Sequence, residues 1–305
     1  MTQDFAVDGG QTRLRLGVVV DGAVRDIVEH DGFRYRPAED PVDSTVRAIC
    51  AAVAGRPVDR IALGLTSAPS TVDGARRMAR TLLDAVAANE VLVAGDMVTA
   101  HAGALDGGPG VVITAGTGTN CLGVNGDRIE RADGFGYLLG DDGSGFAIGR
   151  AGVAAALRAR EGRGPATSLV DVLDAHFADV ADFPHGIYST DNPVASIASF
   201  TRAVAAAARS GDAVASGLWL RAVDRLIGTA ASVVRRCFPG AVDVPVSYTG
   251  RLFDVADLLR EPFLAGLAAR CPEARTREPR GTSIDGAALL LGAHPYGSLV
   301  ARVAR

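Results

Sequence analysis

Residues 111–120 read VVITAGTGTN, an apolar run that ends directly in a glycine-rich turn. The apolar run over 111–113 predicts a buried strand, and the glycines allow the tight reversal that follows it. The chain returns over 121–124, and Asn125-Gly126 predicts a two-residue hairpin turn before 128–130. This stretch therefore predicts three short strands in succession, with the glycine-rich turn between the first two.

The same order occurs at the N-terminus, where VDGGQT at 7–12 supplies the turn and Asp21-Gly22 the hairpin. In the first half we expect strands over 5–7, 14–18, 24–28, 61–65 and 91–94, and helices over 44–54, 73–88 and from 96. In the second half we expect a further strand over 244–248, helices over 144–160, 254–269 and 284–291, and a helical stretch over 166–238.

This repeated order indicates an internal duplication of a β-β-β-α-β-α unit. It predicts an α/β fold of two mixed-sheet domains that face each other across a cleft. We expect an N-terminal lobe over 1–108 and a C-terminal lobe over 109–305, with a helical insertion over about 160–240. The last helix is expected to pack back on the first lobe, and 275–281 to be a solvated loop.

The composition excludes several classes of protein. A net charge of −4 and a pI near 5.8 argue against a nucleic-acid binder, which needs a basic face. The chain contains no lysine, which excludes a Walker A phosphate loop. With no export signal and no apolar run near the ~20 residues that span a membrane, we expect a cytoplasmic protein without membrane contact. The cysteines are too widely spaced for a CxxC pair, which favours reduced core thiols at Cys50, Cys121, Cys237 and Cys271.

The two glycine-rich turns indicate a phosphate site, because turns without side chains leave backbone N–H groups open to an anion. One such turn is usually a matter of geometry, whereas two at matching places in a duplicated fold favour a phosphate chain held by both lobes. A side chain at Gly118 is expected to fill the space that the phosphates approach. Asp8 opens the first turn and is expected to hold Mg²⁺ through water, or to hydrogen-bond its own turn.

Carboxylates and an amide mark the acceptor side. Asp96 ends the strand over 91–94, where an α/β protein usually presents functional side chains, although aspartate there also suits a helix cap. Asp141 and Asp142 precede the helix over 144–160, which needs only one cap, so one carboxylate remains for substrate hydroxyls. Asn120 follows the second turn and can donate and accept, as a polyol requires, or serve the turn itself.

Six segments, in this order, resemble the BadF/BadG/BcrA/BcrD ATPase family, and within it the N-acetylglucosamine kinase branch. They are VDGGQT (7–12), AGDMVTAHAGAL (94–105), VVITAGTGTN (111–120), GFGYLLGDDGSG (134–145), YTGRLFDVADLLREPF (248–263) and DGAALLLG (285–292). The resemblance implies a duplicated actin-like (ribonuclease H-like) ATPase fold, ATP and Mg²⁺ as cofactors, and a homodimer. It implies an ATP-dependent kinase acting on a hydroxyl group, expected to be the 6-hydroxyl, of N-acetylglucosamine or glucosamine.

The resemblance also assigns residues. It implies Asp96 as the catalytic base and Asp8 as the Mg²⁺ residue. It implies sugar contacts by Asn120, Phe135, Asp141 and Asp142. ATP contacts are implied for Gly9, Gly10, Gln11, Thr12, Gly116, Thr117, Gly118, Thr119, Gly250 and Arg251. The chain departs from the family at two of these positions: Gln11 stands where many members have glycine, and Phe135 where some kinases have tryptophan.

Two other functions remain open at this stage. One is an ATPase that activates a partner enzyme through an iron–sulfur cluster, although the cysteine spacing does not match that motif. The other is a nucleotide-dependent sensor without catalysis, which the presence of Asp8 and Asp96 disfavours.

Overall fold

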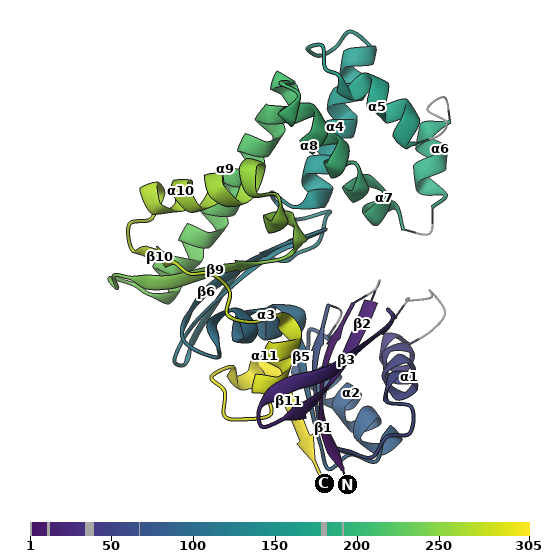
Figure 1. The fold of residues 1–305 in the computed structure, drawn as a ribbon, viewed down its shortest axis with the longest axis vertical. Helices are drawn as coiled ribbons and strands as arrows, with labels where there is room; N and C mark the ends of the chain where they lie inside the picture. The colour runs from purple at the N-terminus through teal and green to yellow at the C-terminus, as the bar shows by residue number, and fades with distance from the viewer. Residues whose placement is uncertain (1, 11–12, 34–39, 67, 178–181, 191) are drawn as a thin grey trace. The chain divides into compact units, whose positions relative to one another are not determined.

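The computed structural model describes residues 2–10, 13–33, 40–66, 68–177, 182–190 and 192–305. Contacts divide the chain into two units (Figure 1). Unit 1 comprises Met1–Val112, Leu122–Ile129 and Glu278–Arg305, and unit 2 comprises Ile113–Cys121 and Glu130–Arg277. Gln11 and Thr12 of the first predicted phosphate turn lie outside the described residues.

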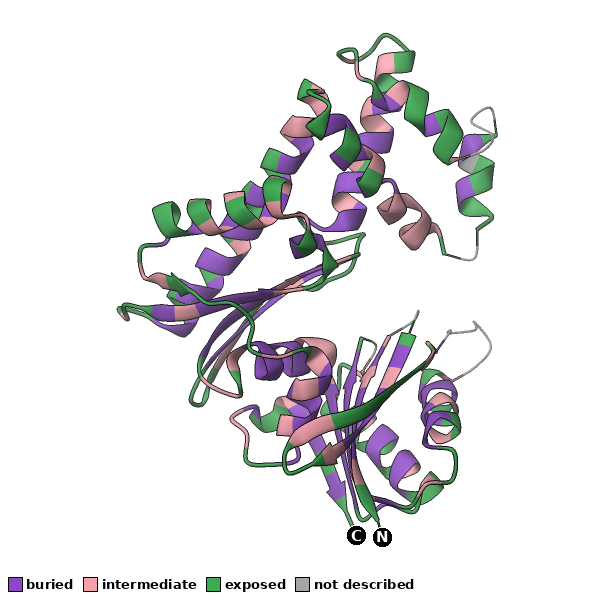
Figure 2. Ribbon diagram, in the orientation of Figure 1, coloured by how far each residue is buried: buried purple, intermediate pink, exposed green. Residues whose placement is uncertain are grey.

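The sheet of unit 1 has the strand order β11-β5-β4-β1-β2-β3. Its strands are β1 (Gln3–Gly9), β2 (Arg13–Val20), β3 (Ala23–Asp31), β4 (Val58–Leu65), β5 (Glu90–Gly95) and β11 (Val300–Ala304). The central strands β1, β4 and β5 run parallel, whereas β2 and β11 pair antiparallel with β1 and β5. The middle residues of the central strands are apolar because helices cover both faces of the sheet, and Figure 2 shows these strands as largely buried.

The side chains of β1 alternate between two apolar clusters, as the period of two in a strand requires. Phe5 and Val7 join a cluster with α1 (Pro41–Val53) and α2 (Val72–Ala85). Ala6, between them, packs on the opposite face with residues of α11 (Ser283–Leu289). This alternation fixes the register of β1 and, with it, the place where the strand ends at Gly9.

Helix α3 (Asp96–Leu105) and α11 lie in very close contact. A Cβ atom at Gly286 would be 1.8 Å from the carbonyl oxygen of Thr99, and one at Gly103 would be 2.0 Å from that of Thr282. Only glycine fits at these two positions. The packing of α11 therefore fixes α3, whose first residue is Asp96.

The sheet of unit 2 has the order β10-β9-β6-β7-β8, which repeats the order β5-β4-β1-β2-β3 of unit 1. Its strands are β6 (Gly110–Ala115), β7 (Thr119–Asn125), β8 (Arg128–Asp133), β9 (Val244–Thr249) and β10 (Ala274–Thr276). The matching strand orders confirm the duplicated fold. The boundary between the units falls within β6, β7 and β8.

Helices make up most of the remainder of unit 2, as the sequence predicts. They are α4 (Gly145–Arg160), α5 (Leu169–His176), α6 (Phe183–Tyr188), α7 (Pro193–Ser199), α8 (Thr201–Arg209), α9 (Ala213–Cys237) and α10 (Glu261–Arg270). No helix in the described part of the chain is long and apolar enough to cross a membrane.

The structure differs from the sequence-based prediction in three places. The expected helix over 254–269 is broken into a 3₁₀ turn (Arg251–Asp254), a π-helical segment (Ala256–Arg260) and α10. Pro262 lacks the amide hydrogen that an unbroken α-helix would need at this point. The predicted loop over 275–281 begins within the short strand β10, and β11 is a strand that the sequence pattern did not reveal.

Candidate functional site

In unit 1 the glycine turn and the predicted base lie in one row across the sheet. Gly9 pairs with Leu65 across β1 and β4, and Leu65 pairs with Gly95 across β4 and β5. The next residue of each parallel strand is therefore Gly10, Thr66 and Asp96. A Cβ atom at Gly10 would be only 3.2 Å from the hydroxyl oxygen of Thr66.

Asp96 is the first residue of α3, and the residue that caps this helix is Gly95, without a side-chain bond. The Asp96 carboxylate accepts hydrogen bonds from the Thr66 hydroxyl and the Met97 amide. Burial raises the pKa of Asp96, and the negative charge of Asp8 raises it further, while the two hydrogen bonds lower it. This is the environment expected of a carboxylate that takes up a proton during a reaction.

Asp8 lies at the end of β1, and its carboxylate accepts hydrogen bonds from the Nε and Nη2 atoms of Arg15. No group of three or more His, Cys, Asp or Glu side chains within the described residues could hold a metal ion. Mg²⁺ is usually bound by one or two carboxylates together with substrate phosphates and water, and a single carboxylate such as that of Asp8 fits this kind of site. Asp8 can take that part.

The glycines of the first turn have structural tasks as well. A Cβ atom at Gly9 would be 2.8 Å from the ring of Phe33, and the Gly10 amide donates to the carbonyl of Arg13. The turn itself therefore uses the Gly10 amide, whereas the sequence argument treated this amide as open to an anion.

The second turn joins β6 to β7 in unit 2, and it divides into two parts. The Gly116 amide donates to the Gly118 carbonyl, and the Thr119 amide donates to the Asp141 carboxylate over 3.0 Å. A Cβ atom at Gly118 would be 2.9 Å from both carboxylate oxygens of Asp141. Asp141 therefore occupies the space that a side chain at Gly118 would fill, and the approach of phosphates to this glycine stays a prediction. At Gly116 a Cβ atom would meet nothing within 4 Å.

The loop that carries Asp141 is held by Asp133, the last residue of β8. The Asp133 carboxylate accepts hydrogen bonds from the amides of Gly134, Asp141 and Asp142. Ser144 caps α4 by accepting from the Ala147 amide, so neither neighbouring aspartate is needed as the cap. Asp141 is partly buried, and burial raises the pKa of its carboxyl group, whereas Asp142 is exposed.

Two further predicted sugar residues differ in their surroundings. Asn120 is partly buried, and its Oδ1 atom is buried without a hydrogen-bond partner among the described residues. An unpaired buried acceptor is costly, which makes it a natural contact for a ligand hydroxyl. Phe135 is 73% exposed on the same loop as Asp141. The structure thus brings Asn120 and Asp141 to the second turn and leaves Phe135 and Asp142 at the surface.

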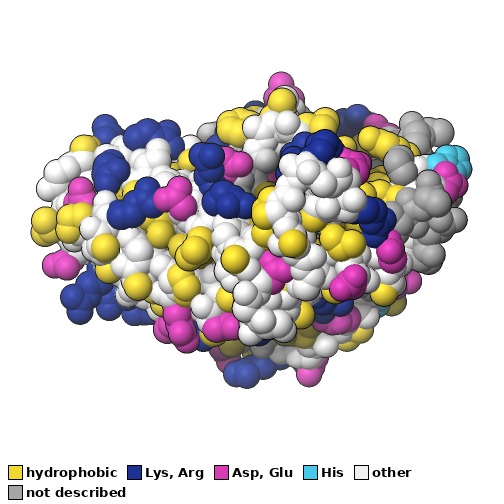
Figure 3. All heavy atoms as spheres, turned by 90° about the horizontal axis from the view of Figure 1, so that it is seen from above, with side chains coloured by type: hydrophobic (Ala, Val, Ile, Leu, Met, Phe, Trp, Pro, Cys, Tyr) yellow, Lys and Arg dark blue, Asp and Glu magenta, His cyan; other side chains and the backbone are white. Residues whose placement is uncertain are grey.

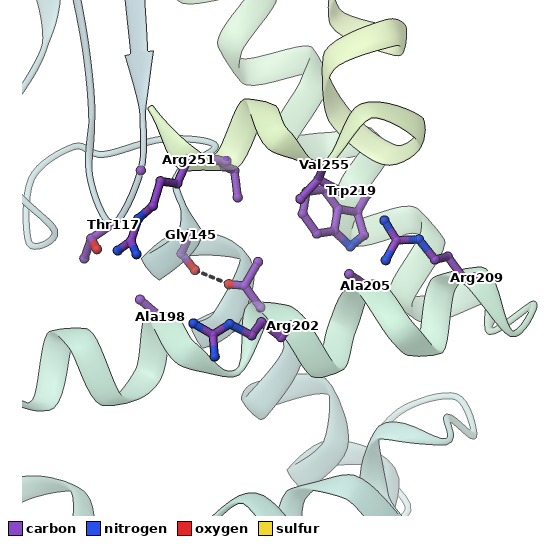
Figure 4. Close-up of a pocket in the computed structure, with 12 residues that line it drawn as sticks. Thr117, Gly145, Ala198, Arg202, Ala205, Arg209, Trp219, Arg251 and Val255 are labelled. Carbon is purple, nitrogen blue, oxygen red and sulfur yellow. Dashed lines mark hydrogen bonds between the residues drawn. The ribbon is translucent and has the colours of Figure 1, made fainter. Parts of the chain in front are cut away.

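A pocket of about 380 Å³ opens within unit 2 beside this turn (Figure 4). Gly116 and Thr117 line it together with Arg251, which follows β9. One face of α8 supplies Arg202 and Ala205, and Trp219 of α9 also lines the pocket. Two segments that the sequence assigned to ATP, far apart in the chain, therefore meet at one pocket.

Gly118, Thr119 and Gly250 are placed differently from the other predicted ATP residues. Gly118 and Thr119 contact Asp141, and the Thr119 side chain is buried. Gly250 has a φ of +96°, and a Cβ atom there would be 2.2 Å from the Ala115 carbonyl oxygen. Gly250 is thus required for the close approach of two chain segments.

Sequence reasoning missed Thr66, Arg202, Ala205 and Trp219. Thr66 follows the apolar strand β4, and the end of a parallel strand is itself a signal for a site residue. The residues of α8 and α9 gave no such signal, because their helical spacing reads simply as a buried face.

The cysteines do not suggest a cluster site. They form no disulfide within the described part of the chain, and burial raises the pKa of the Cys50 and Cys271 thiols.

On the face seen in Figure 3, basic and acidic side chains are interspersed with apolar ones.

The chain matches the model of the BadF/BadG/BcrA/BcrD ATPase family over residues 7–290. An N-acetylmuramic acid/N-acetylglucosamine kinase of Clostridium acetobutylicum is 29% identical over 204 residues, 66% of this chain and 67% of that protein. A solved Chromobacterium violaceum protein described as an N-acetylglucosamine kinase has a TM-score of 0.74 and 26% identity, covering 96% of this chain and 99% of that one.

A ROK family glucokinase of Streptomyces griseus, solved with glucose and AMPPNP, has a TM-score of 0.61 at 20% identity, covering 94% of this chain and 98% of that one. At this identity the likeness concerns the fold, which is the two-domain actin-like ATPase fold that the duplicated sheets predict. With the family match extending over nearly its whole length, the chain belongs to the BadF/BadG/BcrA/BcrD ATPase family.

Proposed function

We propose that the protein transfers the γ-phosphoryl group of ATP to the 6-hydroxyl group of N-acetylglucosamine or glucosamine. The family match and the kinases among the similar proteins support phosphoryl transfer to an amino sugar. The observation that carries the proposal is the row Gly10–Thr66–Asp96, which holds a carboxylate of raised pKa beside a glycine turn.

Asp96 is proposed as the general base. Its burial raises the pKa, which makes the carboxylate a better proton acceptor than an exposed aspartate, while the Thr66 bond keeps it oriented. As the sugar oxygen attacks the γ-phosphorus, its proton passes to the Asp96 carboxylate, and ADP leaves. Asn120 and Asp141 are proposed to bind sugar hydroxyls, with Phe135 and Asp142 as outer contacts on the same loop.

The nucleotide is proposed to occupy the pocket of unit 2, with its phosphates near Gly116 and Thr117 and its adenosine near Arg251. Asp8 would hold Mg²⁺, which neutralises charge on the phosphate oxygens when bound. Gly9, Gly10, Gln11 and Thr12 remain proposed phosphate contacts on the basis of the family resemblance. Gly9 and Gly10 carry no side chain that would block the approach of an anion.

The test is a coupled ADP-release assay with ATP and Mg²⁺ across a panel of hexosamines and hexoses. We expect slow hydrolysis of ATP alone and strong acceleration by N-acetylglucosamine or glucosamine. The position of the new phosphate on the product, read by ³¹P NMR, tests the 6-hydroxyl. ATP consumption that is the same with and without every sugar would leave ATPase activation of a partner, or nucleotide sensing, as the function.

The homodimer implied by the family resemblance is part of this proposal. Its measurement is the molar mass in solution by light scattering, with and without nucleotide and sugar.

A further inference from the structure

The pocket of unit 2 has a polar end and an end that is apolar except for Arg209, which is paired with Asp257. Figure 4 shows Thr117, Gly145 and Arg251 together at one side, and Ala205, Trp219 and Val255 together at the other. The backbone at the polar end is fixed, because the Gly145 carbonyl accepts from the Thr201 hydroxyl over 2.6 Å and the Gly145 amide donates to Gly116. A ligand with an anionic part and a flat apolar part matches this arrangement.

Trp219 at the apolar end carries an unsatisfied donor. The residue is 1% exposed, and its Nε1 atom is buried with no hydrogen-bond partner among the described residues. An indole N–H can only donate, and leaving such a buried donor unpaired costs free energy. In Figure 4 the indole nitrogen lies on the edge of the ring that faces Ala205 of α8, another pocket residue.

The position of Trp219 is well determined by its neighbours. Its helix α9 is capped by Asp212, which accepts from the Ala215 amide and from the Thr167 hydroxyl. Near the same end of the pocket, Arg209 of α8 forms two hydrogen bonds with Asp257 at 2.7 and 2.8 Å. Trp219 is buried on this capped helix, so a ligand acceptor must come to its indole donor.

We propose that the indole N–H of Trp219 donates to a ring nitrogen of the adenine base of ATP and so contributes to the selection of the nucleotide. This inference rests on the proposed use of ATP. Adenine is flat, fits between apolar side chains, and carries in-plane acceptors at N1, N3 and N7. The indole nitrogen is covered in this structure, and because the side chain of Ala205 opposite it is small, a small displacement of α8 is enough to let the edge of a base reach it.

The experiment measures equilibrium binding of ATP and of 1-deaza-, 3-deaza- and 7-deaza-ATP by calorimetry, with Mg²⁺ and without sugar. Each analogue keeps the shape of adenine and lacks one acceptor. We expect one of them to bind the wild type about five- to tenfold more weakly than ATP, the effect of one lost hydrogen bond. W219F should bind ATP more weakly by a similar factor and should no longer discriminate against that analogue.

The control is Y188F, which also removes one polar hydrogen from an aromatic ring, at a side chain that is 84% exposed. It should bind all four nucleotides like the wild type. Trp219 is the single tryptophan of the chain, so its fluorescence should also change when ATP binds to the wild type. If W219F does not fold, equal affinity of the wild type for ATP and all three analogues still overturns the proposal.

Equal affinity of the wild type for ATP and all three analogues would overturn the proposal. An equal loss of affinity for one analogue, relative to ATP, in the wild type and in W219F would also overturn it. Absence of any ATP binding would overturn it too. The proposed kinase function is judged separately. If W219F loses the discrimination against one analogue but no sugar stimulates ADP release, only the kinase function is rejected. If a sugar stimulates ADP release but W219F keeps the discrimination, only the role of Trp219 is rejected.

Discussion

Thr66 and Asp96 follow neighbouring parallel strands of unit 1, and the Thr66 hydroxyl donates a hydrogen bond to the Asp96 carboxylate. The bond opposes burial and the charge of Asp8, both of which raise the pKa of Asp96. The start of α3 also distinguishes the two roles, base or helix cap, that the sequence left open for Asp96. The helix cap is Gly95, so the carboxylate of Asp96 is available for chemistry.

Asp96→Asn should lower kcat by about 10²- to 10⁴-fold, because an amide of the same shape cannot take the proton. KM for ATP should change little, since the proposed nucleotide contacts lie elsewhere. Steady-state kinetics with saturating sugar provide the measurement. Asp106→Asn, at the other end of α3, is the matched control and should keep wild-type turnover. Near-normal turnover of Asp96→Asn would eliminate the base assignment.

The same substitution should stabilise the fold at neutral pH. When a carboxyl group has a raised pKa in the folded state, the fold becomes less stable as the pH rises through that pKa. An amide carries no charge and avoids this loss of stability. Urea unfolding should therefore give a higher free energy of unfolding for Asp96→Asn than for the wild type at pH 7.5. The difference should shrink toward pH 4, and its absence at both pH values would contradict the burial argument.

Thr66→Val should move the acid limb of the kcat/KM profile to higher pH. The hydroxyl lowers the pKa of Asp96, so its removal lets burial raise that pKa further, and the base is protonated over a wider acid range. At high pH the variant should recover most of its activity. Thr81→Val, at a partly exposed position of α2, is the control. An unshifted acid limb in Thr66→Val would mean that Asp96 does not control this limb.

The fold could be predicted largely from the sequence, because the repeated order of strands and turns is a local pattern. The glycine turns and the apolar runs around them are sufficient to predict both sheets except for the edge strands β10 and β11. What could not be predicted depends on contacts between distant segments. The glycines of α3 and α11 look like weak helix positions until Gly103 and Gly286 are seen to lie against the backbone of the other helix.

The site was predictable where residues follow strands, and less so where helices supply them. Asp8, Asp96 and Gly116 could be chosen because strand ends present functional groups. That Asp141 lies against Gly118 could not be predicted, because a glycine in a turn does not reveal which neighbour needs the space. Trp219 was not chosen, since a tryptophan on the apolar face of a helix is usually core.

Gly116→Ala and Gly118→Ala should have different kinetic effects. At 116 the new methyl group meets no protein atom within 4 Å but enters the pocket, so KM for ATP should rise by about tenfold with the fold intact. At 118 it collides with Asp141, so KM for the sugar should rise instead. Kinetics with each substrate varied in turn make the test. A rise in KM for ATP alone in Gly118→Ala would support that glycine as a phosphate contact.

His101 provides a prediction about stability that is independent of catalysis. Its ring is fully buried, with Nε2 3.1 Å from the Gly110 carbonyl oxygen and Nδ1 3.0 Å from the Tyr296 hydroxyl oxygen. A carbonyl can only accept, so Nε2 carries the hydrogen, and Nδ1 accepts from Tyr296. The histidine is therefore held neutral, and burial lowers its pKa from 6.5 to about 4.

Between these two pKa values the unfolded chain binds a proton at His101 that the folded chain does not, so stability falls as the pH falls from 6.5 toward 4. At pH 5 the loss relative to pH 7 should be about 2 kcal/mol from this residue. Urea unfolding of the wild type and His101→Gln at both pH values measures it, and the variant should lack this part of the pH dependence. His185→Gln, at an exposed position of α6, should keep the wild-type dependence. If His101→Gln lost as much stability as the wild type between pH 7 and pH 5, the titration would have to reside elsewhere in the chain.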